Sequence, residues 1–176
     1  LRLSDPPIPL PPTISHPFPP SVPSLYRATT DDDLETARTL FREYVESLTF
    51  DLDFQEVEAE MQSLPGPYAA PEGAILLAEA DGEPAGVVAV KPLDDPGVCE
   101  MKRLYVRPDH RREGIGRALA RAVLEVAADL GYDVMRLDTV ASMTAARSLY
   151  HSLGFEERDA YYPNPLPGAV YLEKDL

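Results

Sequence analysis

The chain has 176 residues, enough for one domain with a sizeable hydrophobic core. Its formal net charge of −14 argues against general binding of nucleic acids or anionic membranes. Cys99 is the one cysteine, so an intrachain disulfide and a cysteine-based metal site are both excluded, and we expect a cytoplasmic protein. No apolar run approaches the length of a membrane span, and the beginning lacks the continuous apolar region of a signal peptide.

Proline sets residues 1–24 apart from the rest of the chain. Nine prolines fall in this segment, and proline supplies no backbone N–H for a helix or an inner strand. The composition predicts an extended, polyproline-like arm. Two interpretations stay open: an unstructured tail, or an arm that packs on its own domain or on a partner subunit. Residues 25–176 are expected to form a single domain.

From residue 25 onward, hydrophobic periodicity and turn residues predict the element order β-α-α-β-β-β-α-β-α-β-β. The first predicted helix has acidic residues in its first turn, where they favour a helix. An Asp-Gly pair at 81–82 predicts a hairpin turn between the two strands within 73–92. The expected strands are 25–29, two within 73–92, 98–106, 133–140, 155–158 and 169–176, and the expected helices are 30–48, 53–64, one from about 114 to 131, and 144–153.

Two glycines, Gly114 and Gly116, stand where a strand passes into a helix. The first N–H groups of a helix have no intrahelical partner and lie at the positive end of its dipole, and glycine keeps side chains out of the way of an anion. A nucleotide-hydrolase loop is excluded because no Gly-Lys-Ser/Thr follows, and a dinucleotide fingerprint is excluded because Leu119 replaces its third glycine. A phosphate cradle and a plain turn into a helix both remain.

The charge distribution favours the cradle. Between Lys102 and Arg121 lie seven basic and two acidic residues, a local charge of +5 against −19 for the rest of the chain. A small polyanionic ligand would be attracted to such an island. The alternative is a solvated helix face, which Arg117 and Arg121 partly fit.

The stretches EMKRLYVRPDHRREGIGRALARAVLEVA and LDTVASMTAARSLYHSLGF together resemble the GNAT superfamily of acetyl-CoA-dependent N-acetyltransferases. The resemblance covers about Leu25 to Leu176 and is sharpest from Glu100 to Phe155. It implies an α/β (α+β) GNAT fold: a mixed, mostly antiparallel twisted sheet of six or seven strands with about four helices. The sheet would be splayed between its fourth strand, ending at Val106, and its fifth, at Val134–Val140.

The resemblance also implies acetyl-CoA as co-substrate, bound in that splay. Backbone groups of Leu104, Tyr105 and Val106 would pair with the pantetheine arm like an added strand. The pyrophosphate would be held by the loop made of Arg111, Arg112, Glu113, Gly114, Ile115, Gly116 and Arg117. One position departs from the pattern: Met143 stands where many members have Asn, so a pantetheine contact is missing or is replaced by Ser142 or Thr144.

Amide formation needs an amine that has lost a proton and a thiolate leaving group that gains one or is stabilised. Glu100 matches the place of a general base in several GNAT members, with Asp138 as a weaker candidate; the alternative is a surface-strand Glu paired with Lys102. Tyr150 matches the family's tyrosine near the CoA sulfur and would protonate the thiolate; the alternative is a core aromatic. Transfer would be direct within a ternary complex, because Cys99 has no histidine placed to activate it and suits a buried position.

The acceptor is expected to be a primary amine of a small molecule or peptide, and the acidity of the chain would favour a cationic one. Its groove would be lined by the first two helices and the late hairpin, which points to the aromatic residues Phe50, Phe54, Tyr68, Tyr161 and Tyr162. Core packing is the alternative for these side chains.

No metal is expected, because His16, His110 and His151 lack ligand spacing, and the net charge of −14 argues against a nucleic-acid or membrane partner. The protein would be a monomer or homodimer. A non-catalytic acyl-CoA sensor or partner-binding domain is the competing hypothesis, and the presence of both Glu100 and Tyr150 favours the enzyme.

Overall fold

The computed structural model describes residues 22–52 and 54–176. Residues 1–21, which carry most of the predicted proline-rich arm and His16, and Asp53 lie outside the described residues. The elements follow the predicted order, with two short 3₁₀ turns added at Gly66–Tyr68 and Pro108–His110. They are β1 (Ser24–Arg27), α1 (Asp31–Ser47), α2 (Phe54–Ser63), β2 (Ala74–Ala80), β3 (Glu83–Pro92), β4 (Val98–Val106), α3 (Ile115–Asp129), β5 (Val134–Val140), α4 (Thr144–Ser152), β6 (Glu156–Arg158) and β7 (Ala169–Asp175).

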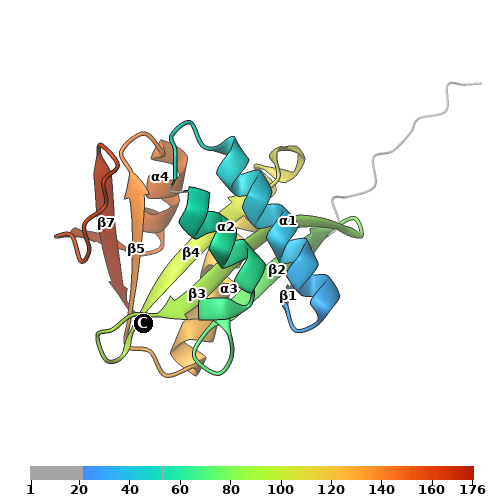
Figure 1. Ribbon diagram of the computed structural model, residues 1–176, viewed down its shortest axis with the longest axis horizontal. Helices are drawn as coiled ribbons and strands as arrows, with labels where there is room; N and C mark the ends of the chain where they lie inside the picture. Colours follow the sequence, from blue (N-terminus) through green and yellow to red (C-terminus); the bar gives the residue numbers. More distant parts are fainter. Residues whose placement is uncertain (1–21, 53) are drawn as a thin grey trace, which may run out of the picture.

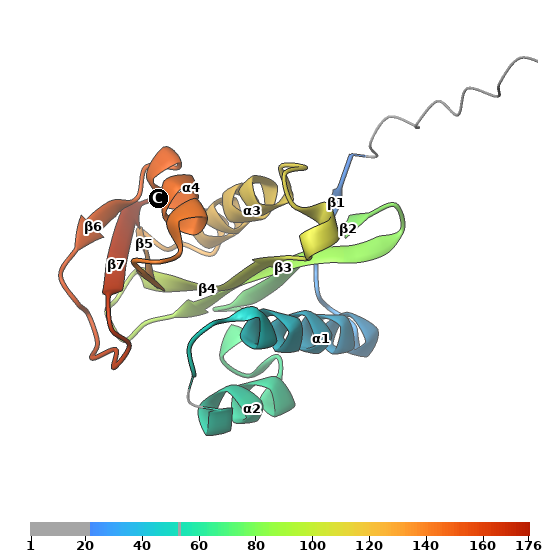
Figure 2. The same ribbon diagram turned by 90° about the horizontal axis from the view of Figure 1, so that it is seen from above.

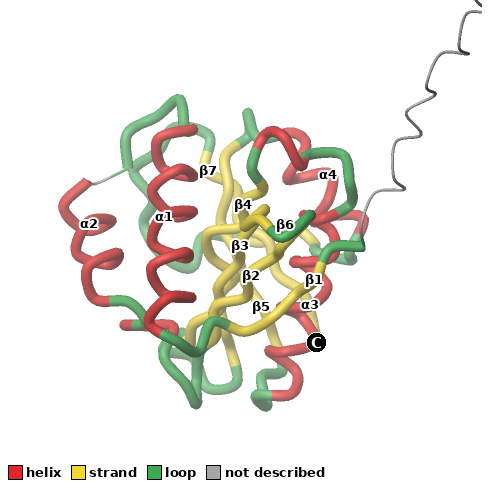
Figure 3. The backbone as a smooth tube through the Cα atoms, turned by 90° about the vertical axis from the view of Figure 1, so that its right-hand side faces the viewer, coloured by secondary structure: helices red, strands yellow, loops and turns green. Residues whose placement is uncertain are grey.

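The described strands form one seven-stranded sheet in the order β1-β2-β3-β4-β5-β7-β6 (Figure 1). Every neighbouring pair is antiparallel except β4 and β5, which run parallel. Helices α1 and α2 cover one face, and α3 and α4 cover the other (Figures 2 and 3). The architecture is the mixed, mostly antiparallel GNAT arrangement predicted from the sequence.

Two hydrophobic cores explain why β2 and β3 are apolar on both faces. In β2, Leu76 faces the core under α3, whereas its neighbours Ile75 and Leu77 face the core under α1. The same alternation continues in β3, where Val88 and Val87 face opposite sides. Since successive side chains of a strand point to opposite faces, a strand between two helical layers must be apolar throughout.

Local sequence signals set the position of α1. Thr30 caps the helix: its hydroxyl accepts from the Asp33 N–H, while the Asp33 carboxylate accepts from the Thr30 N–H, which completes a capping box. The helix buries an apolar stripe that includes Leu40 and Phe41. Strand β1 ends at Arg27, two residues earlier than predicted.

The splay predicted between the fourth and fifth strands is confirmed. Strands β4 and β5 pair only where Val98, Cys99 and Glu100 lie opposite Val134, Met135 and Arg136. Beyond this point β4 continues to Val106 and β5 to Val140 without pairing to each other, so the sheet opens toward their ends.

An irregularity in β4 lies beside this opening. Val87 pairs with Tyr105 and Ala89 with Lys102, so β4 has one residue more than β3 between these pairs. Arg103 has a positive φ of 58° at this point. Such a β-bulge bends its strand and increases the local twist, and bulges are common beside active sites. Among the helices that the structure describes, none combines the length and apolarity needed to cross a membrane.

Candidate active site

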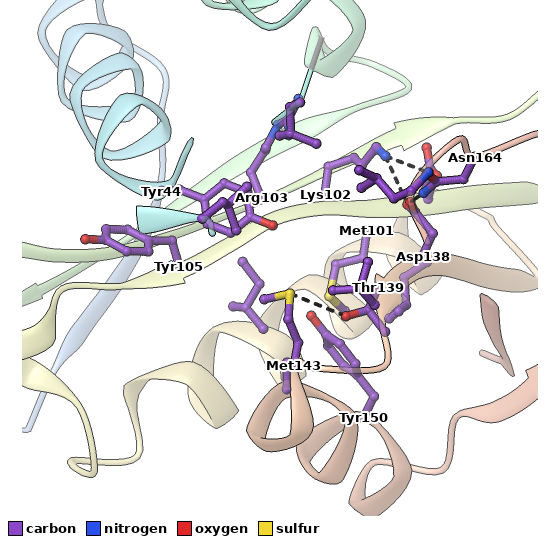
Figure 4. Close-up of a pocket in the computed structure, with 18 of the residues that line it drawn as sticks. Tyr44, Met101, Lys102, Arg103, Tyr105, Asp138, Thr139, Met143, Tyr150 and Asn164 are labelled. Atoms are coloured by element: carbon purple, nitrogen blue, oxygen red, sulfur yellow. Dashed lines mark hydrogen bonds and ion pairs between the residues drawn. The ribbon is translucent and has the colours of Figure 1, made fainter. Parts of the chain in front are cut away.

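A large cleft of about 1620 Å³ opens where β4 and β5 separate. Side chains from α1, β4, β5, α4 and the β6–β7 loop (159–168) line it (Figure 4). Its volume exceeds the range typical of drug-sized ligands, so it has room for more than one substrate. Five of the residues predicted to bind the cofactor line the cleft: Leu104, Tyr105, Val106, Arg111 and Gly116. The others form the turn and the first residues of α3 next to it: Arg112, Glu113, Gly114, Ile115 and Arg117.

The N-terminus of α3 offers free backbone donors. Gly114 is the N-cap in a left-handed conformation, with φ 80°, and makes no side-chain cap hydrogen bond. The first helical hydrogen bond runs from the Ala118 N–H to the Gly114 carbonyl at 3.0 Å. The N–H groups of Ile115, Gly116 and Arg117 therefore have no acceptor inside the helix. Ile115 is 1% exposed, so its side chain belongs to the core and only its backbone is available to a ligand.

The basic island predicted from the sequence divides into two parts. Lys102, Arg103 and Arg107 form ion pairs with acidic side chains contributed by other elements. Arg103, for example, donates two hydrogen bonds to Glu60 of α2, and this pair holds the pKa of Glu60 below its ordinary value although burial alone would raise it. The other four basic residues of the island, Arg111, Arg112, Arg117 and Arg121, form no ion pair with an acidic side chain of the described chain and lie at or near α3.

Glu100 is a buried carboxylate at the closed end of the splay. It is 2% exposed, so the interpretation as a surface-strand residue is wrong, although the pairing with Lys102 is present at 3.5 Å. Lys91 of β3 lies 3.4 Å from the other carboxylate oxygen, and the hydroxyl of Tyr161 donates to Oε1 at 2.6 Å. The two ammonium groups offset much of the cost of burying the negative charge.

Asp138 forms a second carboxylate centre on β5. Lys102 bridges the two centres, since its Nζ also donates to Asp138 Oδ1 at 3.2 Å. The hydroxyl of Tyr162 and, at 2.9 Å, the amide of Asn164 donate to Oδ2. Burial would raise the pKa of Asp138, but the charge of Lys102 and these hydrogen bonds outweigh it and lower that pKa.

Tyr150 of α4 belongs to both the core and the cleft. Its side chain is 8% exposed and packs edge-on against Phe155 with ring centroids 5.8 Å apart, yet it lines the cleft near Met143 and Thr139 (Figure 4). Burial is the main reason that the pKa of its hydroxyl lies above the ordinary value of tyrosine. The ring of Tyr150 therefore packs in the core, as one interpretation from the sequence expects, and its side chain also reaches the cleft.

Comparisons with known proteins agree with this geometry. Residues 34–155 match the model of the acetyltransferase (GNAT) family. An uncharacterised N-acetyltransferase of Schizosaccharomyces pombe is 39% identical over 145 residues, 82% of this chain and 89% of the relative. The uncharacterised N-acetyltransferase YjgM of Escherichia coli is 30% identical over 143 residues, 80% of this chain and 86% of the relative. This chain belongs to the GNAT acetyltransferase family.

The fold agrees with solved GNAT structures. The PaiA N-acetyltransferase of Thermoplasma acidophilum, solved in complex with coenzyme A, gives a TM-score of 0.70 over 89% of this chain and 100% of that one, at 19% identity. An acetyltransferase of Streptococcus agalactiae gives a TM-score of 0.72 over 88% of this chain and 98% of that one, at 18% identity. At these identities the likeness concerns the fold. The chain is thus an acetyltransferase with the family's architecture.

Met143, which the resemblance to GNAT members aligns with an Asn of many of them, lies at the start of α4. It is the N-cap residue of α4 and makes no side-chain cap hydrogen bond. Its sulfur accepts a hydrogen bond from the Thr139 hydroxyl at 3.7 Å. Met143, Ser142 and Thr144 all line the cleft.

The five aromatic residues expected around the acceptor separate into three groups. Phe50, Tyr161 and Tyr162 line the cleft. Tyr68 lies outside the cleft lining: it is 3% exposed, packs edge-on against Phe41 and donates its hydroxyl to Glu60. Its position is therefore that of a core residue, since the 3₁₀ turn after α2 directs it beneath α1. The side chain of Phe54 lies outside the described residues.

Sequence reasoning did not single out Lys91 or Asn164 as parts of the site, and it named Lys102 only as one end of the basic island and as a partner of Glu100. Lys102 follows Glu100 by two residues on β4, whereas Lys91 lies opposite Glu100 on β3, a contact that requires the strand register to be known. Asn164 lies two residues after Tyr162 in the segment YYPNP, whose composition is typical of a turn. Among the residues that the structure describes, no group of three His, Cys, Asp or Glu side chains is arranged to hold a metal ion.

Proposed function

We propose that this acetyltransferase moves an acetyl group from acetyl-CoA to a primary amine of a small molecule or peptide by direct transfer within a ternary complex. The observation that carries the proposal is that one cleft is lined both by the N-terminus of α3 and by the centre formed by Glu100, Asp138 and Tyr150. The first part suits a phosphate-bearing thioester, and the second suits the proton transfers of amide formation.

The cofactor end fits acetyl-CoA, whose thioester supplies an activated acetyl group. The free N–H groups at residues 115–117 would hold the pyrophosphate, and Arg111 with the other unpaired arginines would attract its charge. Backbone groups of Leu104, Tyr105 and Val106 would pair with the pantetheine arm, because β4 has no partner strand on its β5 side in this region. Coenzyme A is bound by the structurally similar PaiA N-acetyltransferase, which supports the same ligand class here.

The proton transfers are assigned to two residues. Glu100 would accept the proton that a protonated amine must lose before it can attack the thioester. Tyr150 would donate a proton to the CoA thiolate. Because burial raises the pKa of Tyr150, its hydroxyl is protonated at physiological pH and has a proton to give.

Direct transfer is supported by the position of Cys99. Its thiol is buried and lies within 3.5 Å of the Val134 carbonyl, to which it donates, and it does not line the cleft. Burial raises the pKa of this thiol to about 12, so thiolate is scarce at neutral pH. Since the sequence has no other cysteine, an acyl-cysteine intermediate is disfavoured.

The proposal is tested by measuring CoA thiol released from acetyl-CoA in the presence of a panel of polyamines, amino acids, amino sugars and short peptides. At least one amine should accelerate thiol release and gain an acetyl group by mass spectrometry. With that amine, varying both substrates should give intersecting double-reciprocal lines. Binding of acetyl-CoA without turnover of any amine would instead identify a non-catalytic acyl-CoA sensor.

A further inference from the structure

Glu100 has almost no surface of its own in the cleft. At 2% exposure, its carboxylate lies behind the groups that contact it. Oε1 accepts the Tyr161 hydroxyl at 2.6 Å, Lys102 approaches the same oxygen at 3.5 Å, and Lys91 approaches Oε2 at 3.4 Å. An amine entering the cleft therefore meets one of these neighbours before it meets the carboxylate. Neither ammonium group can accept a proton, whereas a tyrosine hydroxyl can accept one while donating its own.

Tyr161 is also held firmly in place. Its ring packs against Tyr162 and Tyr171 with centroids 5.3 and 5.4 Å apart. The guanidinium groups of Arg136 and Arg158 lie 5.6 and 5.7 Å from its centroid. These contacts fix the ring and leave the hydroxyl between Glu100 and the cleft, which Tyr161 lines. A group fixed in this way pays little entropy to reach its reactive geometry.

We propose that Tyr161 is a catalytic proton relay between the acceptor amine and Glu100, an inference that rests on the proposed function. As the N–H bond of the ammonium breaks, the Tyr161 oxygen takes that proton, and the original Tyr161 O–H bond breaks to form an O–H bond on Glu100 Oε1. The step converts ammonium and carboxylate into neutral amine and neutral carboxylic acid, and Tyr161 is unchanged. Glu100 later returns its proton to solvent.

The electrostatics of the site suit a relay better than a tyrosinate base. Burial, and next the charge of Glu100, raise the pKa of Tyr161 far above its ordinary value, so it stays protonated at neutral pH. A protonated hydroxyl can accept a proton only by giving one away at the same time. The groups facing Glu100 are Lys91 from β3, Lys102 from β4 and Tyr161 from the β6–β7 loop, with Asp138 of β5 reached through Lys102.

The neighbouring pair of Tyr162 and Asp138 does not offer the same route. Asp138 accepts from Lys102 on one oxygen and from both Tyr162 and Asn164 on the other. These contacts stabilise its charged form and lower its pKa, which makes it a weaker proton acceptor. Asn164 also donates to the Tyr162 hydroxyl at 3.3 Å and so competes with an incoming amine for that oxygen.

The relay is tested with Tyr161→Phe, which keeps the ring contacts and removes only the hydroxyl. For each amine that the wild-type enzyme acetylates, kcat/KM should fall by about 10- to 1,000-fold, within and just below the usual range for acid–base groups. The melting-temperature shift with acetyl-CoA should be retained. Tyr132→Phe is the control, because its hydroxyl donates to the Glu72 carbonyl outside the cleft, and it should keep wild-type turnover.

Two further readouts separate a relay from a structural role. In mixtures of H₂O and D₂O, the wild-type dependence of kcat/KM on deuterium fraction should be curved, as for two moving protons, and the curvature should disappear in Tyr161→Phe. The protein can also be labelled with ¹³C at the ζ carbon of its tyrosines and measured by NMR in the absence of substrates. The chemical shift of Tyr161 should then change in Glu100→Gln and stay the same in Asp138→Asn.

The outcomes also distinguish failure of the relay from failure of the proposed function. If the wild-type enzyme acetylates an amine and Tyr161→Phe keeps its kcat/KM within twofold, or the curvature persists, Tyr161 is not a relay. A loss found in Tyr162→Phe and absent from Tyr161→Phe would place the proton path at Asp138 and overturn the proposal. A wild-type protein that acetylates no amine contradicts the proposed function itself.

Discussion

Replacing Gly116 should separate ligand binding from stability. A Cβ added there would lie 3.6 Å from Val106 Cγ2 and 4.0 Å from Leu149 Cδ2, which are ordinary contact distances with two residues that line the cleft. Gly116 lies in the first turn of α3 and its φ is not positive, so the fold accepts alanine. Alanine is favoured over glycine in a helix by up to about 1 kcal/mol. Gly116→Ala is therefore expected to fold at least as stably as the wild type.

The size of the effect on binding follows from linkage. Acetyl-CoA at about 100 times its Kd stabilises the folded wild-type protein by roughly 2.7 kcal/mol. For a chain of this size each kcal/mol corresponds to about 2–4 °C in melting temperature, so the ligand should raise it by about 5–10 °C. In Gly116→Ala the new methyl group enters the cleft at the phosphate-binding turn and should remove most of that shift. Gly116→Glu should remove all of it, because a carboxylate there repels phosphate while remaining compatible with the helix dipole.

The assay is thermal unfolding with and without acetyl-CoA, with Gly114→Ala as the matched comparison. Gly114 has φ 80°, and although an added Cβ would meet nothing within 4 Å, a left-handed alanine costs about 1–2 kcal/mol. Without ligand, Gly114→Ala should thus melt a few degrees lower, opposite in sign to Gly116→Ala. A Gly116→Glu protein that folds and keeps the full acetyl-CoA shift would refute the assignment of this turn to the cofactor.

Three other variants test the chemistry. Tyr150→Phe should lower turnover by about 10- to 1,000-fold with an unchanged acetyl-CoA melting shift; wild-type turnover would limit Tyr150 to packing. Glu100→Gln should lower kcat/KM for the acceptor and flatten the acidic limb of the pH profile of kcat/KM. Amines of different pKa serve as the control: the limb moves with the pKa of the amine if it reports the amine, and stays in place if it reports a base of the enzyme. Asp138→Asn should destabilise the fold at neutral pH, because the lowered pKa of Asp138 stabilises the folded state above the unfolded-state pKa. This stability is lost as pH falls through the folded-state pKa, so the melting temperatures of the variant and the wild type should converge in acid. A difference that stays constant with pH would contradict the ion pair with Lys102.

Local patterns predict the order of the elements, but not how the strands pair. The Thr30 capping residue and the apolar stripes of α1 and α3 are written in neighbouring residues, and the resemblance over Glu100–Phe155 added the strand pairing and the splay. Most boundaries differ from the predicted ones by one or two residues, as in α3, which ends at Asp129.

The site was less predictable because its contacts are non-local. The resemblance points to Glu100, but the environment of its carboxylate depends on Lys91 of the neighbouring strand and on Tyr161, 61 residues away in sequence, as well as on Lys102 of its own strand. The expected acceptor groove includes Tyr68 because it follows the second helix, whereas the 3₁₀ turn and the hydrogen bond to Glu60 hold it in the core. No local pattern distinguishes these two environments.

The central claim is tested most directly by a single-turnover experiment with acetyl-CoA labelled with ¹³C at the acetyl carbonyl and the best amine from the panel. The label should pass from CoA to the amine as CoA thiol is released in equal amount, and at no time should the intact protein gain the mass of an acetyl group. Label that accumulates on the protein before it reaches the amine would contradict direct transfer, and label that stays on CoA with every amine would contradict the proposed activity.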